Sequence, residues 1–290
     1  MAQVETVTGP IDSADLGRTL VHEHVFVLGE EHRINYQDWD EDARVAQAQR
    51  DLQELKELGI DTILDPTVLG LGRYIPRIQQ VAAGTDLQIV AATGLYTYNE
   101  IPFQFHYTGP GLLFDVPEPL VDLFVRDLTE GIADTGVRAA FLKCAIEEQG
   151  LTRGVERVMR AVGEASARTS PRSSSAIRAT RPTSTTSCGS RTRARCSVWT
   201  GSVSTCSCRS SSASTPWPSS CAGGYTDRVV LAHDAWCFID WFDAEAKVQA
   251  VPKWNFRHIS EDVLPALRER GVTEADIETM LVANPRRYFE

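Results

Sequence analysis

Along most of the chain, two patterns of hydrophobic residues alternate. Short apolar or β-branched runs fall at residues 19–25, 61–65, 87–92, 139–143 and 228–232, and such runs are typical of buried strands. Between them, apolar residues recur every three or four positions. The predicted helices are residues 43–58, a short one beginning near Tyr74, 119–134, 152–167, 260–270 and 273–283, the last two opened by a capping Ser or Thr. Strands that alternate with helices predict parallel βαβ units, and this many units predict an α/β fold of the (β/α)8 TIM-barrel type.

One segment, residues 170–221, follows neither pattern. Its 52 residues contain 17 serines, seven arginines and five cysteines, and no Asp, Glu or Lys. A low-complexity linker is one interpretation. Disordered linkers, however, are usually rich in Glu and Lys and poor in Trp, whereas this segment contains Trp199 and Trp217. We therefore expect a single barrel domain over residues 1–290 with an aberrant segment inside it.

Composition and charge narrow the class of protein. The 290 residues are 42% hydrophobic and 23% charged, as in an ordinary globular protein, and single α/β barrels reach this size. The formal net charge of −10 argues against nucleic acid or an anionic membrane as a partner. No apolar run approaches the ~18 residues that would span a bilayer. The first residues, Met-Ala-Gln-Val-Glu, lack the regions of a secretory signal, so we expect a cytoplasmic protein.

The strongest chemical signal is Val-His-Glu-His-Val at residues 21–25. On a strand, alternate residues share a face, so His22 and His24 are expected to point the same way and Glu23 the opposite way. Two imidazoles at the C-terminal end of a strand can bind one divalent metal ion. A pair of hydrogen-bonded structural histidines is the alternative, and the position in the first strand of a predicted barrel favours the metal site.

Two further candidates follow predicted strands, where barrel enzymes place catalytic groups. Lys143 closes Ala-Ala-Phe-Leu-Lys and either extends to solvent or reacts with CO2 to form a carbamate that bridges two metal ions. Burial and nearby cations would favour the neutral amine that this reaction needs. Asp234, in Leu-Ala-His-Asp-Ala, is either a helix N-cap or a metal ligand that accepts a proton from water. For its neighbour His233, two roles agree equally well with the sequence. It could be a partner that supports a metal ligand, or it could be purely structural.

Together these motifs resemble the phosphotriesterase family of the amidohydrolase superfamily. The resemblance covers residues 1–169 and 222–290 and includes Gly-Arg-Thr-Leu-Val-His-Glu-His, Ala-Thr-Gly-Leu-Tyr-Thr-Tyr, Leu-Lys-Cys-Ala and Asn-Pro-Arg-Arg-Tyr-Phe. It looks closest to the lactonase subgroup, whose members hydrolyse N-acyl-homoserine and other lactones and often act weakly on organophosphate triesters. It implies a (β/α)8 barrel with two divalent metal ions. Zinc is the metal we expect first, and iron, cobalt and manganese are the alternatives.

The resemblance also implies a role for each candidate residue. His22, His24, carbamylated Lys143 and Asp234 would hold the first metal ion. Asp234 would also act as the catalytic proton acceptor while hydroxide attacks the lactone carbonyl. Lys143 and two histidines from the fifth and sixth strands would hold the second metal ion.

The implied substrate is a small lactone or ester, and a homodimer is a further expectation. Tyr96 would lie against the substrate near the metals, with packing at the rim as its alternative. Trp236 and Trp254, together with Phe238 and Trp241, would line an acyl-chain pocket, and a plain core role fits most of them at least as well.

The second metal site is where this chain departs from the family pattern, because no histidine occurs between His106 and His233. The codons of Ile-Val-Gly-His-Ser-Gly-Asp-Thr, the sixth-strand motif, can be chosen so that reading one base later gives residues 174–180. The same shift turns the substrate-loop motif Leu-Gly-Val-Asp-Arg-Phe-Gly-Ile-Asp into residues 197–205. Too few residues follow Thr169 for the fifth strand, so one strand–helix unit of about 30 residues is also expected to be missing.

These expectations define two functions. The first is a metal-dependent hydrolase of lactones and esters. The second is a catalytically impaired or inactive barrel remnant, incomplete around strands 5–7, with a shifted reading frame in residues 170–221 and only one complete metal site. An inert sugar- or peptide-binding barrel has nothing specific in its favour.

Overall fold

The computed structural model describes residues 2–36, 38–169, 178–180, 197–200 and 226–290. The strands are β1 (Gln3–Thr6), β2 (Gly9–Asp12), β3 (Thr19–Leu20), β4 (His24–Val27), β5 (Thr62–Asp65), β6 (Gln88–Gly94), β7 (Phe141–Ala145), β8 (Arg178–Thr180), β9 (Ser197–Thr200), β10 (Val229–Ala232) and β11 (Trp236–Ile239). The α-helices are α1 (Glu30–Tyr36), α2 (Glu41–Glu57), α3 (Ile75–Ala82), α4 (Pro119–Thr129), α5 (Arg153–Thr169), α7 (Ala244–Ala250), α8 (Leu264–Glu269), α9 (Glu274–Glu278) and α10 (Asn284–Arg286). Short 3-10 turns lie at Ser13–Leu16, Phe103–Phe105 and Thr226–Arg228, and π-helical turns at Ile259–Val263 and Thr279–Ala283.

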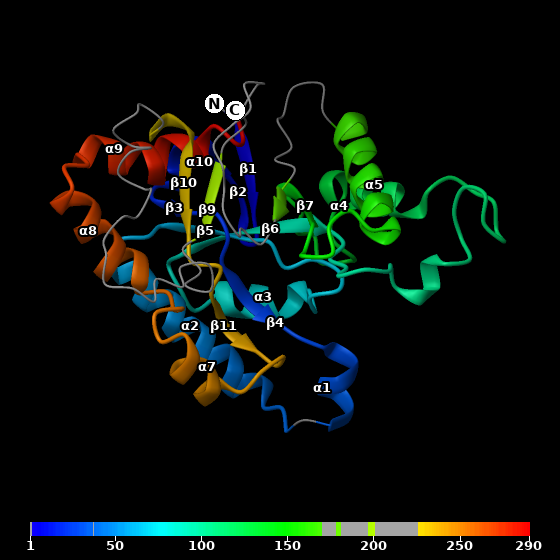
Figure 1. The fold of residues 1–290 in the computed structure, drawn as a ribbon, viewed down its shortest axis with the longest axis horizontal. Coiled ribbons are helices and arrows are strands. Elements are labelled where there is room, and N and C mark those ends of the chain that lie inside the picture. Colours follow the sequence, from blue (N-terminus) through cyan, green and yellow to red (C-terminus); the bar gives the residue numbers. More distant parts are fainter. Residues whose placement is uncertain (1, 37, 170–177, 181–196, 201–225) are drawn as a thin grey trace.

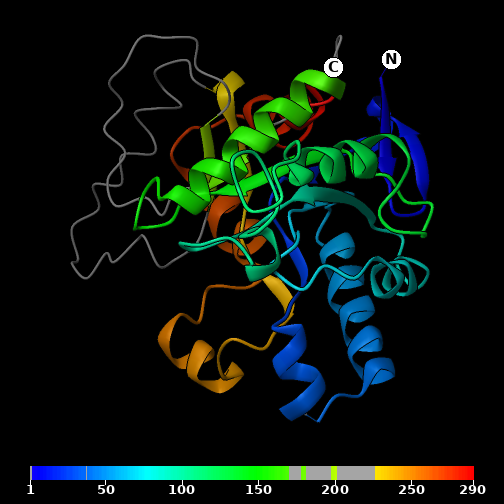
Figure 2. The same ribbon diagram turned by 90° about the vertical axis from the view of Figure 1, so that its right-hand side faces the viewer.

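A curled parallel sheet occupies the centre, with helices on its outer side (Figures 1 and 2). Its largest part has the order β3-β5-β6-β7-β8, while β10 pairs with β9 and β11 with β4, all parallel. The N–H of Val21 donates to the carbonyl of Leu231 at 3.1 Å, which brings β10 beside the end of β3. Parallel strands joined through outer helices are the TIM-barrel arrangement, so the predicted fold class is confirmed.

Alternate residues of the strands belong to two different layers of the core, one between the sheet and the helices and one inside the curl of the sheet. Ile63 of β5 and Ile89 of β6 pack with the helices, and their neighbours Leu64 and Val90 pack inside the curl. Phe141 of β7 also belongs to the interior cluster. Because side chains alternate along a strand, Lys143 shares the interior face with Phe141. On the outer side, α2 packs on α3, and α4 packs on α5.

The structure corrects several predicted boundaries. The helix expected at residues 119–134 ends at Thr129, and the following loop holds Ala133 at a positive φ of 50°. The strand expected at 139–143 runs over Phe141–Ala145, so Lys143 lies inside the strand instead of at its end. Ser260 does not cap a helix, because the helical turn begins earlier, after His258. Thr273 does cap α9, through a complete capping box with Asp276.

The sheet also bears on the expected gap in the barrel. β8, which falls in the segment that we expect to derive from the sixth strand, pairs directly with β7. In the shifted frame, the codon of the sixth-strand histidine would straddle the codons of Ala176 and Ile177. Both residues lie outside the described residues. The pairing supports a missing strand–helix unit between β7 and β8. No helix within the described ranges has both the length and the apolar character that crossing a membrane requires.

Candidate metal centre

His22, His24 and Asp234 converge at one end of the curled sheet. Asp234 Oδ1 lies 3.3 Å from His22 Nε2 and 3.6 Å from His24 Nε2. One ligand atom from each of the three residues can be chosen so that all lie within 4.8 Å of one another. The histidine side chains are 2% and 7% exposed, while that of Asp234 is 33% exposed. The cluster is therefore a buried pair of imidazoles opposed by a carboxylate that solvent can reach.

The histidine pair does not sit on one regular strand, which corrects the premise of its prediction. β3 ends at Leu20 and β4 begins at His24, so His22 lies in the irregular segment between them. This segment is held on both sides: the N–H of Glu23 donates to Leu64 at 3.2 Å, and the N–H of His24 donates to Ala235 at 2.8 Å. The two imidazole centroids are nonetheless only 5.2 Å apart.

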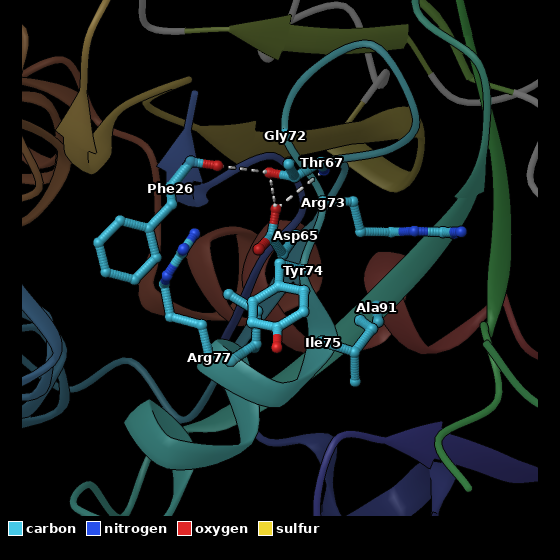
Figure 3. A pocket seen from close by; sticks show the side chains of 10 residues that line it. Phe26, Asp65, Thr67, Gly72, Arg73, Tyr74, Ile75, Arg77 and Ala91 are labelled. Carbon is cyan, nitrogen blue, oxygen red and sulfur yellow. Dashed lines mark hydrogen bonds between the residues drawn. The ribbon is translucent and has the colours of Figure 1, made fainter. Parts of the chain in front are cut away.

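A buried network fixes the ring of His24. Its Nδ1 lies 2.7 Å from the hydroxyl of Thr67, which donates to Asp65 Oδ1 at 2.5 Å (Figure 3). Because the single hydroxyl proton goes to Asp65, Thr67 can only accept from His24, so His24 carries its proton on Nδ1. Its Nε2, on the side of Asp234, then keeps the lone pair that a metal ion needs. Burial raises the pKa of Asp65 to about 6, although the bonds from Thr67 and the charge of Lys143 lower it.

Sequence inspection did not find Asp65 and Thr67, since their signal is only an Asp-x-Thr at the end of a strand. Asp65 shares the outer face of β5 with Ile63, and its carboxylate reaches a small pocket between the sheet and α3 (Figure 3). The other residues of the pocket are Phe26, Gly72, Arg73, Tyr74, Ile75, Arg77, Ile78 and Ala91. The pocket thus lies on the helix side of the sheet, and Thr67, the partner of His24, forms part of its wall.

We expect Thr67→Val to lower the affinity for Co2+ by roughly 10–100-fold, the usual effect of losing an outer partner of a ligating histidine. Valine keeps the shape but removes the acceptor that orients His24 Nδ1. The matched control is Thr93→Val, since the buried Thr93 hydroxyl also donates to an aspartate, Asp127, at 2.6 Å. Both variants should lose stability in thermal unfolding, and only Thr67→Val should lose affinity in a Co2+ titration. Equal affinities for the two variants would contradict the role of Thr67.

Lys143 and Tyr96 lie near this centre. Lys143 is 2% exposed, and its charge lowers the pKa of Asp65 and Glu147, whereas burial raises both. Tyr96 is half-buried, and its side chain forms a hydrogen bond with the side chain of Glu147. Burial, followed by the charge of Glu147 and its hydrogen bond, raises the pKa of Tyr96 well above its usual range, and the charge of Asp234 adds to this. The predicted substrate residue Tyr96 is therefore close enough to Asp234 for the charge of the carboxylate to act on it.

The two predicted substrate tryptophans contact each other next to Asp234. Their ring centroids are 4.4 Å apart, edge to face, and Lys247 Nζ lies 4.3 Å from the Trp236 ring. The Trp254 indole N–H donates to the carbonyl of Asp234 at 2.7 Å. Trp254 thus has a second task that its prediction did not include, because it holds the loop that carries the candidate ligand.

The donor set fits one divalent ion. Two imidazole nitrogens and a carboxylate are groups that first-row divalent metals prefer. The buried Lys143, on the interior face of its strand, would add a ligand only as a carbamate. The second site of the family pattern does not fit this chain. Within the described residues, the group of His22, His24 and Asp234 is the only one of three or more metal-binding side chains, and the sequence has no histidine between His106 and His233.

Comparison with known proteins identifies the family. The model of the phosphotriesterase family matches residues 2–183 and 219–289. The chain belongs to the phosphotriesterase family. It is 46% identical to the phosphotriesterase homology protein of Mycobacterium tuberculosis over 320 residues, which cover 100% of this chain and 98% of that protein. It is 31% identical to the aryldialkylphosphatase of Saccharolobus solfataricus over 310 residues, with 96% of each chain covered.

A solved structure confirms the same relationship. The fold is similar to a mutant of a phosphotriesterase-like lactonase from Deinococcus radiodurans, with a TM-score of 0.79, 26% identity and full coverage of both chains. The resemblance noted in the sequence is therefore confirmed. Phosphotriesterase-family proteins are hydrolases that generally bind divalent metal ions, and this chain is a member of that metal-dependent hydrolase family.

The comparisons also show that this chain lacks residues that its relatives have. The alignment with the Mycobacterium protein runs over 320 residues, whereas the chain has 290, so at least 30 aligned positions have no residue here. The family model leaves residues 184–218 unmatched, and these lie inside the aberrant segment, although residues 170–183 are matched. The alignment length agrees with a lost strand–helix unit, and the unmatched residues agree with an aberrant segment. The place of the loss and the shifted reading frame stay predictions.

Proposed function

We propose that this chain descends from, and retains the first metal site of, a lactone- and ester-hydrolysing phosphotriesterase-family enzyme with a secondary activity on organophosphate triesters. The convergence of His22 and His24 on Asp234 Oδ1, at 3.3 and 3.6 Å, carries the proposal. The lactonase among the similar structures supports the substrate class. Zinc suits the two imidazoles and the carboxylate best, and carbamylated Lys143 would complete the ligand set.

A divalent ion held there would supply the positive charge that activates water and polarises the carbonyl or phosphoryl oxygen of the substrate. The protein residues then have separate tasks. Asp234, the most exposed of the three clustered groups, accepts the proton of the attacking water at its carboxylate. Tyr96, which the charge of Asp234 reaches, would lie against the substrate. Trp236 and Trp254, whose rings contact each other, would form the apolar wall around the acyl chain.

The second candidate is a remnant that binds at most one metal ion and turns over substrate poorly or not at all. The absence of any histidine between His106 and His233 favours it, because the family's second metal site needs two histidines from that part of the chain. In this case the family relationship describes ancestry, and the fold retains half of a binuclear centre.

We expect the purified chain to bind one divalent ion and to hydrolyse lactones slowly. The experiment is metal analysis of the Zn2+-loaded protein combined with assays on an N-acyl-homoserine lactone and on an aryl dialkyl phosphate. Two bound ions with robust turnover would contradict the remnant, whereas no bound ion and no turnover would contradict the enzyme. Sequencing the gene across codons 165–225 tests the shifted frame independently, since a one-base shift must restore an apolar strand pattern.

A further inference from the structure

The carboxylate of Glu23, between the two candidate histidines in the sequence, faces the loop that carries Asp234. The side chain is fully buried. Its Oε1 accepts from the backbone N–H of His233 at 2.6 Å and lies 3.1 Å from His233 Nδ1, and its Oε2 accepts from the N–H of Ala235 at 3.3 Å. The donors therefore come from the residues immediately before and after Asp234.

The hydrogen bonds of His233 define its tautomer. The backbone N–H of Ile259 donates to His233 Nε2 at 3.0 Å, so this nitrogen carries no proton. The proton of the neutral ring is consequently on Nδ1 and is donated to Glu23. The carboxylate of Glu23 thus accepts from three N–H groups, and hydrogen bonds to a charged acceptor are stronger than those between neutral groups.

Asp234 has a backbone conformation that its surroundings must maintain. Its φ is +56°, in the left-handed region that few non-glycine residues adopt, Asn and Asp more readily than the others. Such a conformation persists where neighbouring contacts over-determine it. Here the N–H of Asp234 donates to the carbonyl of His22 at 3.0 Å, and its own carbonyl accepts from Trp254 at 2.7 Å. Glu23 adds a charged hydrogen-bond acceptor to these contacts.

We propose that Glu23 is a positioning residue for Asp234. Its buried carboxylate fixes residues 233–235, so that Asp234 Oδ1 faces both histidines of the centre. The histidine pair and the carboxylate ligand come from opposite ends of the chain, and Glu23 joins them with bonds that need no metal ion. The inference rests on the proposed metal centre and deepens it, since it explains how the site is formed before metal binds.

The test is Glu23→Gln, followed by Co2+ titration and the visible absorption spectrum of the bound ion. Glutamine has the same shape, but its amide NH2 must replace one carboxylate oxygen, so a donor faces the N–H of His233 or Ala235. We expect Co2+ affinity to fall roughly 10–100-fold and the Co2+ absorption bands to shift as the Asp234 carboxylate leaves the ion. The matched control is Asp127→Asn, because Asp127 is a buried carboxylate bonded to Arg73 and Thr93 and lies outside the cluster. It should unfold at a lower temperature than the wild-type chain but keep its Co2+ affinity and spectrum.

A second variant covers the case in which Glu23→Gln does not fold. His233→Ala removes one of the three donors to Glu23, so its Co2+ affinity should fall by a smaller factor, and the double variant should be no worse than Glu23→Gln alone. A Glu23→Gln or His233→Ala protein with wild-type affinity and spectrum would overturn the positioning role while leaving the metal centre intact. Wild-type protein that binds no Co2+ would overturn the metal centre itself, and the positioning role with it.

Discussion

Asp234→Asn is expected to abolish tight divalent metal binding and, with it, any hydrolysis. The carboxylate opposes both imidazoles, 3.3 Å from His22 Nε2 and 3.6 Å from His24 Nε2, and asparagine replaces its charge with a neutral amide. Asparagine tolerates the positive φ of this position as well as aspartate does, so the backbone should keep its conformation. The fall in Co2+ affinity should exceed the roughly 10–100-fold that losing an outer partner costs.

The control for Asp234→Asn is Asp240→Asn. Asp240 follows β11, and both of its carboxylate oxygens lie 2.9 Å from the backbone nitrogen of Gly29. It does not belong to the group of His22, His24 and Asp234. Asp240→Asn, like Asp234→Asn, removes one negative charge from the chain segment around β11. A general electrostatic effect would therefore lower the Co2+ affinity of both variants. Co2+ titration of the two variants should show a large loss for Asp234→Asn and a change within about twofold for Asp240→Asn, the scale of a screened surface charge. Similar affinities in both would contradict the assignment of Asp234 as a ligand.

The parts of the site that could be predicted are those whose signal is local. The alternation of buried strands and amphipathic helices indicated the barrel. The His-x-His pair and a late Asp indicated the three residues that the structure brings together. Even there, the reason given for the pair was incomplete. His22 lies in an irregular segment after β3 instead of on the same strand as His24. The backbone bonds of Glu23 to Leu64 and of His24 to Ala235 hold this segment in place.

The partners that hold the ligands could not be predicted, because their bonds span long stretches of sequence. Glu23 contacts residues about 210 positions away, and Thr67 reaches His24 across 43 positions. A single sequence contains no record of which buried donor meets which acceptor after folding. Trp254 is a further example, since its aromatic character predicted an apolar wall but gave no sign that its indole N–H also bonds the Asp234 carbonyl.

Gly94→Ala should be the most destabilising of the single changes considered, because Gly94 lies against the backbone of Lys143. The two residues pair in register between β6 and β7, and a Cβ on Gly94 would come within 1.9 Å of the Lys143 carbonyl oxygen. The φ of +144° adds conformational strain. Overpacking typically costs 1–3 kcal/mol and a strained backbone a further 1–3 kcal/mol, so we expect a loss of about 2–6 kcal/mol in the free energy of unfolding, measured by denaturant titration.

A second glycine separates the clash from the strain. Gly150 also has a positive φ, +74°, but a Cβ there would meet no atom within 4 Å. Gly150→Ala should therefore lose only about 1–2 kcal/mol and keep its Co2+ affinity. Gly94→Ala should lose Co2+ affinity as well, because relieving the clash moves the strand that carries Lys143. If Gly94→Ala costs no more than Gly150→Ala, β7 can shift without penalty. In that case Lys143 is not held rigidly enough to serve as a ligand in the proposed centre.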